Sequence, residues 1–247
     1  MQLPVTVGDH VEMRNTSIVK GIICREGTYD DFVAREIAGT YGWMTVEGRR
    51  VLDIGGNIGA YARWALDNGA ARVMSIEPEA SNFICLQHNT VPGGGRYPRP
   101  HMMSGVVEAT QGVEGQVMVA SRALVAAEAG VGEIWLSPTG KNPGNTSSVK
   151  YRGRISQGEI PQLSFSELLE EEQPDVLKID VEGAEYGFFT EPLPDCVRQC
   201  TMEIHLTRPE WRSGAGPRIA SYFKSWEVVR EPIFAGGHWQ TIGAWRR

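Results

Sequence analysis

Hydrophobic and polar positions alternate along this chain between two patterns, one typical of strands and one typical of helices. Short apolar runs at 50–54, 72–76 and 175–180 are each followed by a helical stretch. The apolar face of the helix expected after the first run consists of Ile58, Tyr61, Ala62, Ala65 and Leu66. This succession of strands and helices predicts an α/β fold with a mostly parallel sheet and right-handed crossovers.

Other segments extend this prediction at both ends of the chain. Residues 5–25 alternate apolar and polar positions, which indicates one or two short strands. A helix capped at Thr28 is expected next, and Ser164 with Glu167 forms a capping box that predicts another helix. A further helix is expected from 181–185. Additional strands are predicted at 101–107, 116–120, 133–136, 201–206, 226–230 and 238–246.

The domain organisation expected from these elements is a single domain over residues 1–247. Residues 1–40 form an amino-terminal flap and helix, and residues 41–247 form the core, with an insertion around 108–150. Within that insertion, the polar, turn-rich stretch 137–148 is interpreted as a lid, a binding loop or a disordered segment.

Composition narrows the class of protein. The 247 residues include 41% hydrophobic and 22% charged residues, which is ordinary for a globular enzyme. The net charge of −6 does not favour nucleic-acid binding. Four cysteines lack zinc spacing, which favours free thiols in a reducing compartment. With no signal peptide or membrane span visible, a cytoplasmic protein is expected.

The segment 51–61 carries the first candidate chemistry. Its turn has the spacing D-x-G-x-x-x-G, formed by Asp53, Gly55 and Gly59, and Asn57 lies inside it. Glycines allow the backbone to approach a ligand closely, and Glu77 ends the next strand, where an acid can bind a ribose. An acid in the turn would repel a pyrophosphate but suits a positively charged amino-acid tail. The pattern therefore favours S-adenosylmethionine over NAD or ATP; the alternative is a turn whose glycines serve only packing.

A second group of candidate residues follows from alternation along two later strands. Lys178 and Asp180 share one face of their strand, and Glu203 and His205 share one face of theirs. Ligands in open α/β sheets bind beyond the carboxyl ends of the strands. Asp180 and His205 are therefore expected to converge there with Asp53 and Glu77.

Several roles are open for this second group. His205 is a candidate general base that accepts a hydroxyl proton, or else a hydrogen-bonded structural histidine. Asp180, Glu182 and Glu185 can orient a polyol or hold a positive charge, or else only favour a helix amino-terminus. A divalent ion held by Asp180, Glu203 and His205 is chemically possible, although no metal is expected. Lys178 is interpreted as a structural ion-pair partner.

Four segments together resemble the FkbM family of class I methyltransferases. They are Val51–Gly59, Ile76–Pro78, Asn145–Ser148 and Asp175–Glu185, and the last is the most family-specific. The resemblance covers about residues 41–206. It implies a Rossmann-like, seven-stranded sheet, mostly parallel with its last strand antiparallel and with helices on both faces. It also implies S-adenosyl-L-methionine as methyl donor, with S-adenosyl-L-homocysteine as product.

The resemblance also implies roles for individual residues. Asp53, Gly55, Asn57 and Gly59 would line the methionine part of the donor, with Gly56 beside them. Glu77, next to Pro78, would hold the ribose hydroxyls. Asp180 and Glu182 would face the methyl-transfer side. The residues expected in a substrate loop are Asn145, Thr146, Ser147 and Ser148.

The function predicted from the sequence is S-adenosylmethionine-dependent O-methylation of a hydroxyl on a small molecule, a sugar or another natural product. A nucleic-acid methyltransferase acting on the ribose 2′-hydroxyl is the alternative, although neither an N-P-P-Y tetrad nor a Pro-Cys nucleophile is present. A non-catalytic binding protein of the same fold is the third hypothesis. The segment 112–141 departs from the family pattern, so the acceptor is not specified by the resemblance.

Overall fold

A computed structural model of the chain describes residues 16–90, 106–109, 115–136, 146–147, 155–205, 215–233 and 240–247. The strands are β1 (Thr16–Val19), β2 (Ile22–Arg25), β3 (Arg50–Ile54), β4 (Arg72–Ile76), β5 (Val106–Ala109), β6 (Val117–Ser121), β7 (Leu124–Ala126), β8 (Gly130–Leu136), β9 (Thr146–Ser147), β10 (Ile155–Ser164), β11 (Val176–Ile179), β12 (Gln199–His205), β13 (Glu227–Arg230) and β14 (Gln240–Arg246). The helices are α1 (Asp30–Tyr41), α2 (Ala60–Asp67), α3 (Ala80–Thr90), α4 (Phe165–Glu172), the 3₁₀ turn η1 (Glu185–Gly187) and α6 (Ala215–Tyr222).

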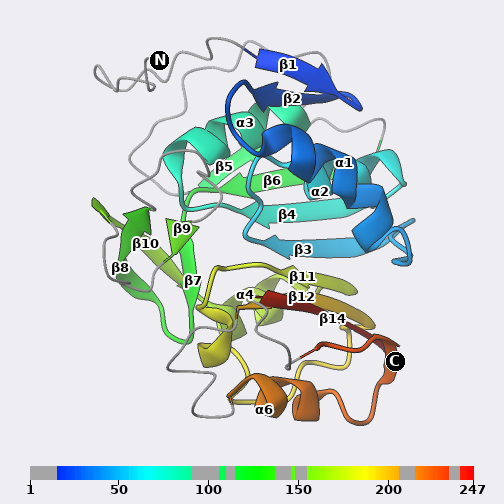
Figure 1. Cartoon of the computed structure of the whole chain (residues 1–247). Coiled ribbons are helices and arrows are strands. Elements are labelled where there is room, and N and C mark those ends of the chain that lie inside the picture. Colours follow the sequence, from blue (N-terminus) through cyan, green and yellow to red (C-terminus); the bar gives the residue numbers. More distant parts are fainter. Residues whose placement is uncertain are drawn as a thin grey trace.

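The central sheet has eight strands in the order β13-β14-β12-β11-β3-β4-β6-β5 (Figure 1). β14 runs antiparallel to both of its neighbours, as predicted for the last strand. The predicted number of seven strands is corrected by β5, which adds an eighth strand antiparallel to β6. The connection from β5 to β6 is too short for the crossover that a parallel pair requires, so the two strands pair antiparallel.

Helices cover both faces of the sheet, because alternate residues of the central strands point to opposite sides. On one face, Val51 of β3 and Val73 of β4 pack with buried residues of α1, α2 and α3. On the other face, Leu52 of β3 and Met74 of β4 pack with buried residues of α4 and α6 and with Phe188, which follows η1. The sheet is therefore covered on both faces, and ligands of such sheets bind at the carboxyl ends of the strands.

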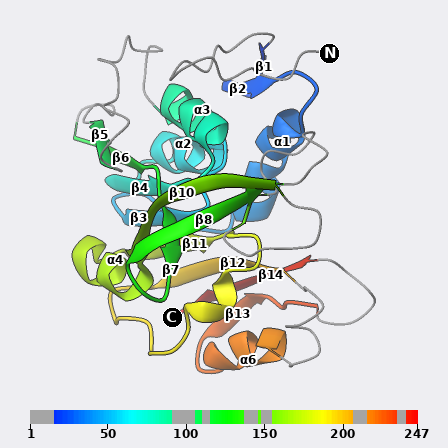
Figure 2. The ribbon, with the colours of Figure 1, turned by 90° about the vertical axis from the view of Figure 1, so that its left-hand side faces the viewer.

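Two smaller β structures flank this core. β1 and β2 form an antiparallel hairpin next to α1 and α3, in agreement with the strands expected within 5–25; residues 5–15 of that expectation lie outside the described residues. A second sheet has the order β7-β10-β8-β9 and lies in front of the central sheet in Figure 2. It begins three residues after β6 and continues through β10 to Ser164, beyond the insertion expected at 108–150.

Local signals in the sequence set two helix starts. The Ser164 hydroxyl accepts a hydrogen bond from the Glu167 amide, which confirms the predicted start of α4 and one of the two hydrogen bonds of the capping box. The Thr28 hydroxyl accepts from the Asp30 amide, so α1 begins at Asp30 rather than at Thr28 itself. The helix expected from 181–185 is instead a turn followed by η1. Glu182 and Gly183 have positive φ there, at 53° and 107°, which interrupts a right-handed helix.

Candidate active site

The glycine turn between β3 and α2 lies directly against the end of β11. A Cβ on Gly55, whose φ is +84°, would stand 1.7 Å from the Asp180 carbonyl oxygen. A Cβ on Gly59 would stand 2.8 Å from the Leu86 Cα in α3. The protein itself therefore requires both glycines, because the turn must fit between Asp180 and α3. This close fit also brings the turn and the 180–182 segment to opposite sides of one pocket.

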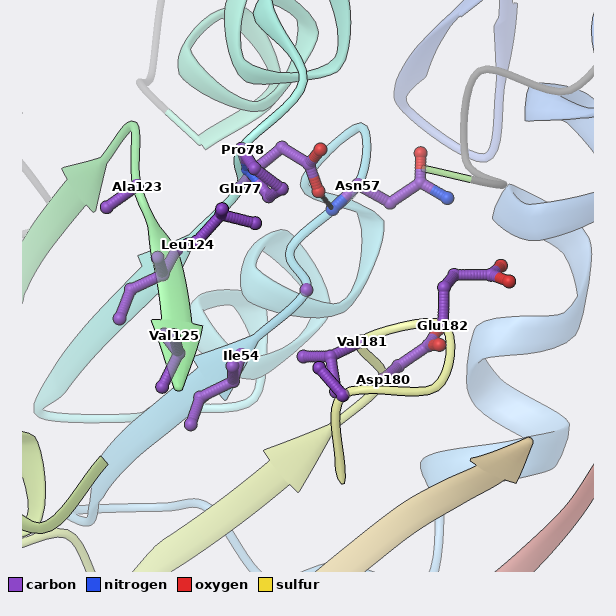
Figure 3. Close-up of a pocket in the computed structure, with 13 residues that line it drawn as sticks. Ile54, Asn57, Glu77, Pro78, Ala123, Leu124, Val125, Asp180, Val181 and Glu182 are labelled. Carbon is purple, nitrogen blue, oxygen red and sulfur yellow. Dashed lines mark hydrogen bonds between the residues drawn. The ribbon is translucent and has the colours of Figure 1, made fainter. Parts of the chain in front are cut away.

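The pocket is open to solvent at the carboxyl ends of the central strands, and about 500 Å³ of empty space lies within it, open solvent included. It is lined by Ile54, Gly55, Asn57, Ile76, Glu77, Pro78, Ala123, Leu124, Val125, Asp180, Val181, Glu182 and Ala184. Figure 3 shows Glu77 and Pro78 on one side, Asp180 and Glu182 on the other, and the apolar run 123–125 along a third wall. Gly56 and Gly59 are not among the lining residues.

Glu77 is almost fully buried and its carboxylate fastens the turn to the start of α3. Oε2 accepts a hydrogen bond from the Asn57 amide at 2.8 Å, and Oε1 accepts from the Glu79 amide at 2.9 Å. Burial raises the pKa of Glu77 to about 7, although these amide hydrogen bonds oppose that change. The carboxyl group thus titrates near neutral pH at the pocket wall.

Asp53 has a different environment from the one suggested by its position in the turn. Its side chain is 0% exposed and lies beneath the pocket, outside the lining residues. Oδ2 accepts a hydrogen bond from the Ser75 hydroxyl at 2.7 Å, and the Lys178 Nζ lies 3.1 Å from Oδ1. The three residues are register partners on β11, β3 and β4. Lys178 is therefore the ion-pair partner that the sequence predicted.

Lys178 also stabilises the glycine turn through a hydrogen bond. Its Nζ donates to the Gly55 carbonyl oxygen and lies 4.0 Å from Asp180 Oδ2. Burial lowers the pKa of Lys178, but Asp53 and Asp180 outweigh this and raise it overall. The ammonium group therefore stays charged, and it connects Asp53 with the turn and with Asp180.

Asp180, Glu203 and His205 converge beside the pocket, as alternation along β11 and β12 predicted. One ligand-type atom from each of these residues lies within 4.8 Å of the other two. The His205 Nε2 is 3.4 Å from Glu182 Oε2 and 3.6 Å from Glu203 Oε1, while its Nδ1 is 3.5 Å from Glu185 Oε1. We call Asp180, Glu182, Glu185, Glu203 and His205 the acid–histidine cluster.

The charges in this cluster shift the pKa of His205 strongly. Burial lowers it, but the contact with Glu185 and the charges of Glu182, Glu185 and Asp180 raise it overall to about 10. Burial and the neighbouring Asp180 raise the pKa of Glu203 to about 8. At neutral pH the imidazole is protonated, so in this state it cannot accept a hydroxyl proton. This shift argues against His205 as the general base, a role that stays a prediction.

Glu185 holds the acid–histidine cluster together from within. Its side chain is 0% exposed, and its oxygens accept from the Gly183 amide at 2.9 Å and from the His205 amide at 2.6 Å. Sequence reasoning grouped Glu185 with Asp180 and Glu182 as an acid that can orient a polyol or hold a positive charge, and assigned it no contact of its own. One feature of the sequence could have indicated that Glu185 points inward: it follows Glu182 by three residues, at the start of a short turn.

The substrate loop expected at Asn145–Ser148 is only partly within the described residues. Thr146 and Ser147 form β9, which pairs with β8 at Leu136 and Trp135. Asn145 and Ser148 lie outside the described residues. The sequence reasoning also missed the run Ala123–Val125, which lines the pocket directly after β6. The available signal was its place just beyond the end of a parallel strand, where ligands bind.

The residues present fit S-adenosylmethionine. The apolar wall of the pocket at 123–125 suits an adenine ring, and Glu77 offers a carboxylate to ribose hydroxyls. Asp180 and Glu182 place negative charge at the opposite wall, which suits a sulfonium cation. These features define a nucleoside-cofactor site in an α/β enzyme.

The chain belongs to the FkbM family of methyltransferases, because the model of the methyltransferase FkbM domain matches residues 53–229. It is an S-adenosylmethionine-dependent methyltransferase, and this membership implies a methyl acceptor whose nature it does not determine. No curated protein matches the chain.

Solved structures resemble the chain only distantly. Magnesium protoporphyrin IX methyltransferase from Synechocystis PCC 6803 with bound SAH has a TM-score of 0.43 and 11% identity, over 87% of this chain and 83% of that one. A putative RNA methyltransferase from Pyrococcus horikoshii has a TM-score of 0.41 and 13% identity, over 88% of this chain and 84% of that one. Family membership therefore rests on the domain match.

Within the described part of the chain, no helix combines the length and apolar character needed to cross a membrane.

Proposed function

We propose that the protein transfers a methyl group from S-adenosylmethionine to a hydroxyl of a small molecule, sugar or other natural product. One observation carries this proposal: Asp180 and Glu182 belong both to the donor pocket and to the acid–histidine cluster. A donor in the pocket and a hydroxyl hydrogen-bonded to these carboxylates would share one wall. Such proximity is what an in-line transfer between two bound molecules needs.

The donor side of the proposal concerns the turn and Glu77. The ionised Glu77 carboxylate would accept hydrogen bonds from the ribose hydroxyls, and Ala123–Val125 would pack against the adenine. Asp53 would act indirectly, since its ion pair with Lys178 supports the turn from below. Bound S-adenosylmethionine supplies an activated methyl group: its carbon–sulfur electron pair returns to sulfur as the new carbon–oxygen bond forms.

The acceptor side of the proposal concerns the proton that the acceptor hydroxyl loses. The hydroxyl must lose its proton as it becomes an ether, and Glu182 is the carboxylate placed to take it. Glu182 lines the pocket and its carboxylate is partly exposed, whereas His205 is buried and protonated. His205 then has a different role in the reaction: its positive charge holds Glu182 and Glu203 in place.

The test is a methyl-transfer assay with isotopically labelled donor against hydroxylated metabolites, glycosides, nucleosides, short RNA and peptides, read by mass spectrometry. The proposal expects label on an oxygen of a small molecule or glycoside. Label on a ribose 2′-hydroxyl of RNA, or only on nitrogen or carbon, would overturn the acceptor class. Donor binding without transfer to any acceptor class would contradict the enzymatic proposal.

A cytoplasmic setting belongs to the same proposal. The four cysteines are free thiols, three of them buried, which suits a reducing compartment.

A further inference from the structure

The acid–histidine cluster has more negative charge than its own residues can balance. Four carboxyl groups surround His205, which supplies at most one positive charge. Lys178 is nearby, but it is already paired with Asp53 at 3.1 Å and only approaches Asp180 at 4.0 Å. Carboxyl groups held this close together repel one another when they are ionised, so this arrangement favours a positive ion between them.

The His205 ring adds an independent observation. The residue is 6% exposed, and neither ring nitrogen makes a hydrogen bond within the part of the chain that the structure describes. Buried imidazole nitrogens ordinarily have such partners, because leaving them without one is unfavourable. Here Nε2 points at the carboxylates of Glu182 and Glu203 at distances longer than a hydrogen bond. A metal ion that binds here would displace the proton of the imidazole, and the ring nitrogen would then offer its lone pair to the ion.

We propose that Asp180, Glu203 and His205 bind one divalent cation, and that its open coordination positions receive oxygens of the methyl acceptor. The acceptor part of this proposal rests on the proposed function; the cation site does not. Two carboxylates and one imidazole suit first-row transition cations such as Mn²⁺ or Fe²⁺ better than Ca²⁺, which prefers oxygen ligands alone.

The geometry needs only a small adjustment. Neighbouring donors on such a cation, at bond lengths of about 2.1 Å, lie about 3 Å apart. The ligand atoms of the cluster are now within 4.8 Å of one another, and Asp180 and Glu203 are both partly exposed. Side-chain rotations that draw them inward by about 1–2 Å complete the site.

The cation would also select the acceptor. Three protein ligands leave about three positions open on a six-coordinate cation. Because Asp180 also lines the donor pocket, an acceptor oxygen in one of these positions would lie on the methyl-transfer side. A compound with two adjacent oxygens, such as a vicinal diol or an α-hydroxy acid, could occupy two positions at once. The inferred substrate class is therefore a chelating hydroxyl compound.

The test is Mn²⁺ binding to the full chain after dialysis against a chelator, followed by electron paramagnetic resonance. The proposal expects one bound Mn²⁺ per chain, with affinity at least tenfold weaker in Glu203→Gln and in His205→Gln. Glu171→Gln is the matched control and should bind Mn²⁺ like the wild type. Glu171 is exposed on α4, at the opposite end of β11 from Asp180.

A second readout does not depend on any variant being folded. In the wild type, Mn²⁺ should broaden the ring proton resonances of His205 selectively, and Zn²⁺ should reverse this by competition. Absence of His205 broadening, or equal Mn²⁺ affinity in wild type and Glu203→Gln, would overturn the cation site.

Calorimetric titration with S-adenosylmethionine separates this inference from the proposed function. Glu203 and His205 do not line the donor pocket, so donor affinity should be unchanged in both variants. Donor binding without Mn²⁺ binding would refute only the cation site, while Mn²⁺ binding without donor binding would refute only the proposed function. If the site is confirmed, chelating hydroxyl acceptors should be methylated at least tenfold faster with Mn²⁺ than with chelator, and equal rates would overturn the acceptor class.

Discussion

The protein buries two groups of charged side chains at the same edge of its sheet, and their charges are balanced differently. In the first, Asp53 faces Lys178, and its other oxygen accepts from Ser75. In the second, four carboxyl groups face one imidazole whose ring nitrogens make no hydrogen bond within the described residues. The first group pairs one acid with one cation, whereas the second gathers four acids around a single imidazole and is unmatched in this sense.

This difference indicates different tasks. A matched buried pair is strongly destabilising only when one partner is removed, and so its role is to hold the turn in place. An unmatched cluster shifts the pKa of its own members, as His205 and Glu203 show, and such shifts concentrate at functional sites. We therefore assign support of the turn to the first group and chemistry to the second.

The largest expected effect is on stability and concerns the matched pair. Lys178→Met should lower the free energy of unfolding by about 3–5 kcal/mol, because it leaves Asp53 as a buried charge without a partner. Urea denaturation measures this. The double variant Asp53→Asn with Lys178→Met should recover most of the loss, since no buried charge remains.

An exposed ion pair provides the control for that experiment. Arg246 contacts Glu227 at 2.6 Å on the surface, and Arg246→Met should cause no measurable loss of stability. If Lys178→Met were as mild as Arg246→Met, the first group would not have the supporting role assigned to it.

The next effect is on donor binding. Glu77→Gln should weaken S-adenosylmethionine binding by about 10–100-fold, because a charged acceptor of ribose hydrogen bonds is lost. Since the pKa of Glu77 is raised to about 7, wild-type donor affinity should fall as the pH drops through that value. Calorimetry at several pH values measures both effects. An unchanged affinity in Glu77→Gln, or the same pH dependence in variant and wild type, would exclude the ribose role.

A smaller and opposite effect on stability is expected in the unmatched cluster. Glu203→Gln removes an acid that the fold keeps protonated near neutral pH against its usual pKa, and should raise the free energy of unfolding there by about 0.5–2 kcal/mol. The same variant should lose catalytic activity. A clear loss of stability would show that this cluster, like the first group, serves mainly to hold the fold.

The smallest effect is the pH dependence of that gain. The pKa of Glu203 is raised in the fold to about 8, so its contribution to stability is present below its unfolded value and is lost as the pH rises through about 8. The stability advantage of Glu203→Gln should therefore grow between about pH 6 and pH 9. Thermal melting across this range measures it, and an advantage independent of pH would contradict the charge argument.

From the sequence, the place where the candidate site residues converge could be predicted better than the contacts that each of them makes. Asp180, Glu203 and His205 converge because alternation and parallel pairing fix which face and which end of a strand a residue occupies. The same rules do not say how deeply a side chain is buried. They therefore did not show that Asp53 lies beneath the pocket against Lys178. The depth of burial depends on the register of β11, β3 and β4, which places Lys178, Asp53 and Ser75 in one row.

Long-range pairing limited the prediction elsewhere. β10 was not predicted, because most of its outward positions are polar and Pro161 lies within it; its pairing with β8 and β7 gives it strand structure. The protonated state of His205 also could not be read from the sequence. It depends on Glu182 and Glu185, which a non-helical turn with positive φ brings to the ring.

The most direct test of the account measures turnover and donor affinity together in Glu182→Gln, with the acceptor found in the methyl-transfer assay. We expect kcat to fall by about 100-fold, because the proton acceptor is lost, while the donor Kd rises by at most about tenfold, since Asp180 keeps a negative charge at that wall. Full turnover in Glu182→Gln would contradict the assignment of chemistry to the unmatched cluster.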